Sequence, residues 1–161
     1  MSTPPRFPRS MALAILILLA LQFLFGMVVN LFVTIPKHHP GSNPPEYFGG
    51  VVRSVDWAIL QGPRWLTAHA LLGLLLLLMA IILLVFGARS GRSSLLWTGI
   101  LGLVGVLGAG FNGGSFLNYH EDFSSMLMSG GFALAVGSYA TMLFVSALER
   151  LRAESARVLA A

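Results

Sequence analysis

The chain has 161 residues, of which 56% are hydrophobic and only 10% are charged, and its mean hydropathy is +0.81. One small water-soluble core cannot bury that much apolar surface, so the composition excludes a soluble globular domain and predicts an all-α integral membrane protein. The net charge of +4 comes from arginines near helix ends; anionic lipids are sufficient partners for them, and we expect no nucleic-acid ligand. The absence of cysteine excludes disulfides and thiolate metal sites.

Four stretches lack charge for long enough to cross roughly 30 Å of hydrocarbon at about 1.5 Å per residue. They lie at about residues 11–35, 65–87, 95–117 and 123–148. Their short second and third links predict an up-down-up-down four-helix bundle over residues 11–148. We expect residues 1–10 to be a disordered cytoplasmic tail, and residues 149–161 to continue the fourth span as a helical cytoplasmic tail.

The first link, residues 36–63, begins with the proline-rich sequence PKHHPGSNPPEYFGG, which opposes regular structure. From about residue 46 to residue 60, apolar side chains then recur at helical spacing: Phe48, Val51, Val52, Val55 and Ile59. With Tyr47 and Trp57 as interfacial anchors, this pattern predicts a short amphipathic helix on the outer membrane surface.

The distribution of basic residues predicts the orientation. One side carries most of the arginines, namely Arg6, Arg9, Arg89, Arg92, Arg150, Arg152 and Arg157, whereas the other carries Lys37, Arg53 and Arg64. The positive-inside rule therefore places both termini in the cytoplasm and the first and third loops outside.

The third span contains glycines at near-helical spacing: Gly99, Gly102, Gly105, Gly108, Gly110, Gly113 and Gly114. Such small residues usually allow close helix packing in membranes, which is the interpretation we favour. A flat ligand pressed against Gly105 and Gly108 is the alternative. The amides of Gln22, Asn30 and Asn112 are expected to bond across helices.

All four histidines, His38, His39, His69 and His120, fall in the predicted outer half. His69 lies inside the second span, where a polar group is costly and tends to face a partner within the bundle. It and His120, which precedes the fourth span, are candidate axial ligands of a heme iron, with Asn112 nearby and Arg64 available to a propionate. Two alternatives stay open: a hydrogen bond from His69 to a neighbouring helix, and a loop position for His120.

His38 and His39 suggest a second type of site. Imidazole and thioether ligands suit copper, so His38 and His39 with Met126 and Met128 form a candidate outer-face copper site. Adjacent histidines tend to point apart, and methionine is common filler in membrane helices, so this pattern is weak.

Several motifs together resemble one four-helix half of the heme A synthase family, or a small membrane b-type cytochrome. They are RWLTAHALLGLLLLL in the second span, VGVLGAGFNGG in the third and HEDFSSMLMSGG opening the fourth. The resemblance implies heme b held near the outer face by His69 and His120. Leu66 and Ala70 replace the carboxylate and arginine that the family places around the first histidine, which argues against heme hydroxylation.

Two function classes follow from these patterns. The first is a membrane heme-binding protein acting in electron transfer or heme handling, which would be an oxidoreductase if it turns over a substrate. The second is a cofactor-free accessory or assembly subunit that packs in the bilayer against a larger membrane complex or a second copy. Copper binding is the third hypothesis. No catalytic residues are assigned, because no nucleophilic triad is present.

Overall fold

The computed structural model describes residues 7–159, apart from the side chains of residues 153 and 157. This part of the chain is all-α, as predicted. Its helices are α1 (Phe7–Phe32), α2 (Tyr47–Leu60), α3 (Arg64–Arg89), α4 (Ser93–Tyr119) and α5 (Asp122–Leu159). The four longest, α1, α3, α4 and α5, are long and apolar enough to cross a membrane, which confirms the predicted number of membrane-length helices.

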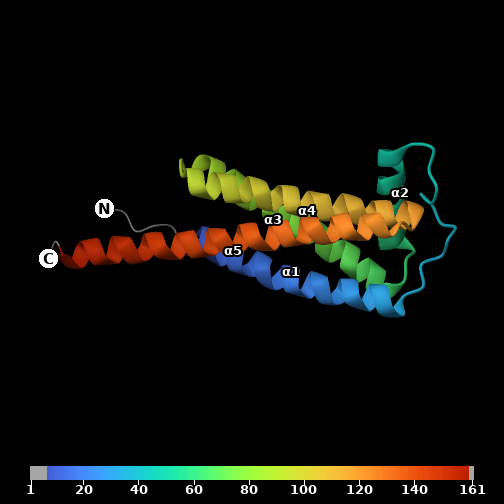
Figure 1. Cartoon of the computed structure of the whole chain (residues 1–161), viewed down its shortest axis with the longest axis horizontal. Coiled ribbons are helices and arrows are strands. Elements are labelled where there is room, and N and C mark those ends of the chain that lie inside the picture. The colour runs from blue at the N-terminus through green and yellow to red at the C-terminus, as the bar shows by residue number, and fades with distance from the viewer. Residues whose placement is uncertain (1–6, 160–161) are drawn as a thin grey trace.

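The four long helices lie side by side, and α2 lies across one end of them (Figure 1). α1 and α4 each pack on both α3 and α5, and the contact between α4 and α5 is the most extensive. α2 packs on α3 and α4. We call the end that carries α2 the cap end, and the opposite end, where α3 joins α4 and α5 extends beyond the bundle, the tail end.

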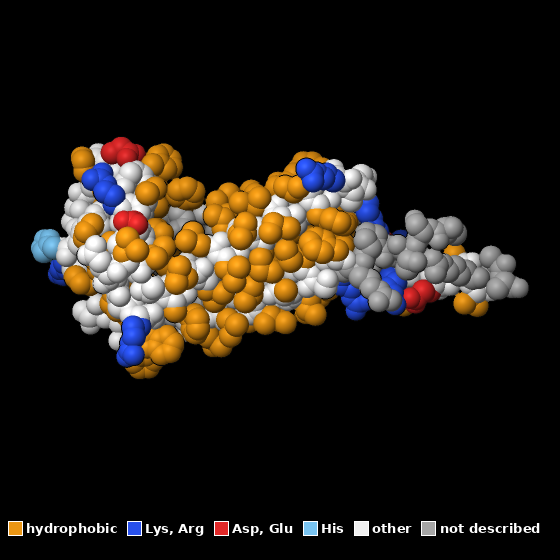
Figure 2. Space-filling view, turned by 180° about the vertical axis from the view of Figure 1, so that it is seen from behind, with side chains coloured by type: hydrophobic (Ala, Val, Ile, Leu, Met, Phe, Trp, Pro, Cys, Tyr) orange, Lys and Arg blue, Asp and Glu red, His pale blue; other side chains and the backbone are white. Residues whose placement is uncertain are grey.

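The surface has the polarity that a bilayer requires. On the face seen in Figure 2, hydrophobic side chains cover the middle of the bundle, and charged side chains gather toward its two ends. Large apolar residues such as Ile17, Phe23, Leu78 and Ile81 are exposed on the long helices, which is consistent with helices that could span a membrane.

The main core draws on all four long helices. Its buried members are Ala12, Ile15, Leu19, Leu76, Ala80, Leu83, Leu95, Val106, Ala135, Tyr139 and Met142. Tyr139 is the largest fully buried side chain, and its ring occupies the space above Gly102, where a methyl group would lie 2.7 Å from the tyrosine hydroxyl. Glycine at position 102 therefore admits an aromatic ring between α4 and α5.

One turn further along α4, the backbone of α4 lies directly against the backbone of α5. A methyl group at Gly105 would lie 2.6 Å from the Ala135 nitrogen, and one at Gly131 would lie 2.6 Å from the Ala109 nitrogen. The favoured interpretation of the glycines as helix-packing residues is confirmed at these positions. It does not extend to Gly108, where a methyl group would meet nothing within 4 Å.

The tail end differs in part from the prediction. α1 begins at Phe7, so residues 7–10 are helical rather than disordered, while residues 1–6 lie outside the described part of the chain. Proline at position 8 is compatible with the first turn of a helix, because its missing N–H would have no intrahelical partner there. α5 continues as helix past residue 148, as expected, and Glu149 on it pairs with Arg92 at the start of α4.

α2 begins where Glu46 caps it, since the Glu46 carboxylate accepts from the backbone N–H of Phe48 at 2.7 Å and of Gly49 at 2.5 Å. The helix was predicted, but its buried face was not. The buried residues are Gly50, Val51, Ser54, Trp57 and Ala58, whereas Phe48 and Val52 are 64% and 66% exposed. The prediction of Trp57 as an anchor at the membrane surface is wrong, because its side chain is buried and only 7% exposed.

Candidate functional site

His69 lies against α1 rather than beside another histidine. Its Nε2 is 3.3 Å from Nε2 of Gln22, and a methyl group at Gly26 would lie 3.1 Å from its Cε1. The arrangement is reciprocal, because the Gln22 amide in turn lies over Gly73, 3.4 Å from where a methyl group would be. Each helix thus receives the other's polar side chain over a glycine, and the predicted bond from Gln22 across helices is confirmed.

His120 occupies the break between α4 and α5. It is the C-cap of α4, with φ of 56° and ψ of 35°, and its backbone N–H donates to the Phe116 carbonyl at 2.8 Å. The left-handed backbone ends the helix, and the side chain is exposed. The ring packs near Phe116 and near His39, at centroid distances of 6.0 and 6.4 Å.

His69 and His120, the two proposed heme ligands, have different surroundings in the described residues. The first ring contacts α1 within the bundle, and the second lies at the exposed cap end. Gly105, proposed to admit the macrocycle, faces the α5 backbone instead, although Gly108 is open. Asn112 donates to the Gly108 carbonyl of its own helix at 2.7 Å. Arg64 is exposed at the start of α3.

His39 is the histidine that the fold holds most firmly. Its ring stacks on Trp57, with centroids 4.2 Å apart and an interplanar angle of 14°. Nδ1 lies 3.0 Å from the Pro40 carbonyl, and Nε2 lies 3.0 Å from the Leu117 carbonyl. Each ring nitrogen thus faces a backbone carbonyl oxygen, and which nitrogen donates depends on the tautomer.

The other proposed copper ligands are dispersed. His38 is exposed in the loop, Met126 is exposed on α5, and the Met128 sulfur lies 3.4 Å from where a methyl group at Gly113 would be. Among the described residues, no group of three or more histidine, aspartate or glutamate side chains is arranged to hold a metal ion.

Asn118, which the sequence analysis did not single out, is the polar centre of the cap end. Its side chain is fully buried, and one amide atom faces the carbonyl oxygens of Gly41 and Gly50 at 3.1 and 3.3 Å while the other faces the Val51 N–H at 3.1 Å. Since carbonyls only accept, the amide nitrogen lies on their side. The hydroxyl of Ser54 is 2.5 Å from the same amide atom.

The backbone of Asn118 adds a further bond, because its carbonyl accepts from the Asn43 N–H at 3.0 Å. One residue at the end of α4 thus joins the loop of residues 33–46 to α2. The close approach needs Gly41, whose φ is +96° and where a methyl group would lie 2.6 Å from the Ser54 nitrogen. The only sequence signal for Asn118 is its place four residues after Gly114, on the glycine-bearing face of α4.

α5 has a second feature, on its side away from the core. Six small residues of this helix are exposed at helical spacing, and we call them the small-residue face: Ser129, Gly130, Ala133, Gly137, Ala140 and Thr141. A methyl group at Gly130 or at Gly137 would meet nothing within 4 Å. The glycines at 102, 105 and 131 are covered by neighbouring helices, whereas this face is open within the described residues.

Comparisons with known proteins add no relative. No protein-family model, no curated protein and no solved structure matches the chain.

Proposed function

We propose that the chain is an accessory or assembly subunit of a larger membrane complex, and that it docks through the small-residue face of α5. The observation that carries the proposal is the open space at Gly130 and Gly137. In a bilayer, burial of apolar surface gives little drive for helix association, so interfaces form where small residues let backbones approach closely.

The remaining lipid-facing surface supports this choice of α5. The exposed side of α1 carries large side chains, including Leu13, Ile17 and Phe23, which keep another backbone at a distance. On α4, Gly102 and Gly105 already serve contacts with α5, and the two α4 glycines with open space, Gly108 and Gly110, are flanked by the exposed side chains of Leu107 and Phe111. The outer face of α5 offers a run of small side chains over about three turns, with the exposed Leu134 beside it and the exposed Met126 and Phe144 beyond its two ends.

The proposal includes a topology. The four long helices cross the membrane in up-down-up-down order, with the tail end in the cytoplasm and the cap end outside. The tail end carries Arg9, Arg89, Arg92, Arg150 and Arg152, whereas the cap end carries Lys37, Arg53 and Arg64. The positive-inside rule supports this orientation, and it places α2 near the outer membrane surface.

Two chemically identical substitutions test the docking face. Ala133→Leu enlarges the small-residue face, and Ala20→Leu enlarges an exposed position on α1. In native gel electrophoresis of mildly solubilised membranes, we expect the tagged chain to migrate well above its own 17.3 kDa. Ala133→Leu should reduce the share in the larger species several-fold, and Ala20→Leu should leave it unchanged.

Three results would contradict the proposal: migration of the unmodified chain as a monomer only, equal behaviour of the two variants, or the same large species formed by the purified chain alone. The last result would indicate a homo-oligomer in place of an accessory subunit.

A visible absorption spectrum of the purified chain tests the heme hypothesis. We expect no Soret band that depends on His69, because its Nε2 faces the Gln22 amide and its ring is packed over Gly26. A Soret band that disappears in His69→Ala and persists in His38→Ala would overturn the accessory-subunit proposal and restore heme binding.

A further inference from the structure

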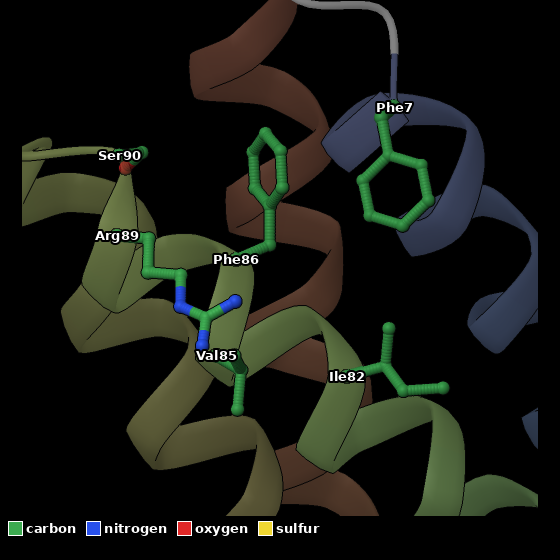
Figure 3. A pocket seen from close by; sticks show the side chains of 6 residues that line it. All are labelled: Phe7, Ile82, Val85, Phe86, Arg89 and Ser90. Atoms are coloured by element: carbon green, nitrogen blue, oxygen red, sulfur yellow. The ribbon is translucent and has the colours of Figure 1, made fainter.

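A groove of about 290 Å³ opens on the surface at the tail end, between the start of α1 and the end of α3. Figure 3 shows the side chains that line it: Phe7, Ile82, Val85, Phe86, Arg89 and Ser90. The rings of Phe7 and Phe86 lie side by side, with centroids 5.0 Å apart. The wall is therefore apolar and aromatic, with one charged side chain at its edge.

The charged side chain has no acidic partner within the protein. Arg92 pairs with Glu149 and Arg150 pairs with Glu154, but no described carboxylate pairs with Arg89. Arg89 lies in the last turn of α3, seven residues after Ile82 on the same helix face. Its guanidinium bends back along the helix toward Val85, beside the groove (Figure 3).

The second polar residue is already engaged. The Ser90 hydroxyl donates to the Gly87 carbonyl at 2.7 Å and accepts from the Arg92 N–H at 3.2 Å. Arg89 is thus the group that is available to an anion at this point of the membrane boundary.

We propose that this groove binds one anionic phospholipid, with the phosphate at Arg89 and part of an acyl chain along Phe7, Ile82 and Val85. A guanidinium matches a phosphate with two parallel hydrogen bonds, and basic sites between membrane helices are known to hold anionic headgroups. The volume of about 290 Å³ is just below the roughly 300–1,000 Å³ of small-molecule pockets, which suits a chain segment better than a whole soluble ligand. The site does not depend on the docking face of α5.

Lipid retention by the detergent-purified full chain tests the proposal. The chain is titrated with dioleoyl phosphatidylglycerol or dioleoyl phosphatidylcholine, and bound lipid is counted by native mass spectrometry. We expect the anionic lipid to bind about fivefold more tightly, and Arg89→Gln to remove this preference. Arg89→Lys should keep part of it, because the charge remains.

Two further variants locate the site. Arg64→Gln removes an exposed arginine from the opposite end of the same helix, and it should leave the preference unchanged. Val85→Trp fills the groove and should weaken binding of the anionic lipid. Val85 is itself exposed, so tryptophan there does not enter the core, and an unchanged helical circular dichroism spectrum would verify the fold.

Equal binding of both lipids, or the same loss in Arg64→Gln as in Arg89→Gln, would overturn the proposal. Displacement of the lipid by millimolar inorganic phosphate, with no effect of Val85→Trp, would show a free-phosphate site and would also overturn it.

Discussion

At the scale of single residues, polarity alone does not tell which side chains build a site. His69 and His120 attract attention because ionisable groups near a membrane core are costly, yet the first contacts Gln22 and the second is exposed. Asn118, one of several asparagines near helix ends, is the residue that is fully buried and joins the loop to α2. What distinguishes it is its set of partners, which are distant in the sequence.

Replacement of Asn118 should therefore loosen the cap end. Asn118→Ala leaves the Ser54 hydroxyl and the Gly41 carbonyl without their partner, so we expect the chain to lose about 1–3 kcal/mol of stability. Hydrogen exchange should rise in residues 33–46 and in α2, measured by mass spectrometry in detergent. Asn30→Ala, at an exposed position on α1, is the matched control. Similar exchange in both variants would refute the role given to Asn118.

At the scale of helices, two glycines one turn apart on the same helix can have different surroundings. Gly105 lies against the backbone of α5, whereas Gly108, one turn away on α4, has open space beside it. The near-helical spacing of glycines in α4 reveals a helix adapted for close contact. It does not reveal which glycine faces which neighbour, because that depends on the rotation of α4 against α5.

Alanine substitutions separate these two positions. Gly105→Ala forces α4 away from Ala135 and Gly131, so we expect it to destabilise the chain by about 1–3 kcal/mol. Gly108→Ala should be neutral or stabilising by up to about 1 kcal/mol, because alanine favours helix. The midpoint of thermal unfolding in detergent reports the change in stability of each variant. A larger loss of stability in Gly108→Ala than in Gly105→Ala would contradict the packing of α4 on α5.

At the scale of the whole molecule, the fold combines an apolar bundle with two polar ends of different character. The cap end is closed by α2 and the hydrogen bonds of Asn118, whereas the tail end carries most of the arginines and an extension of α5. This asymmetry is the basis of the proposed orientation in the membrane.

The chain has no native cysteine, so single cysteines report the orientation without background. We expect His38→Cys, at the cap end, to react with a membrane-impermeant maleimide in intact cells. Ser93→Cys, at the tail end, should react only after the membrane is opened; both positions are exposed. The reverse pattern would invert the proposed topology. Labelling of both cysteine variants in intact cells would exclude any topology that places the two ends of the bundle on opposite sides of the membrane.

The sequence by itself determined the fold class, the number of membrane-length helices and the presence of α2, because hydropathy and charge along the chain are local properties. Only the tertiary structure decided the contacts of the histidines and of Asn118. His69 meets a residue 47 positions away, Ser54 one 64 positions away, and His39 one 78 positions away. Such pairs depend on how each helix is rotated toward its neighbours, which the pattern of a single helix does not specify.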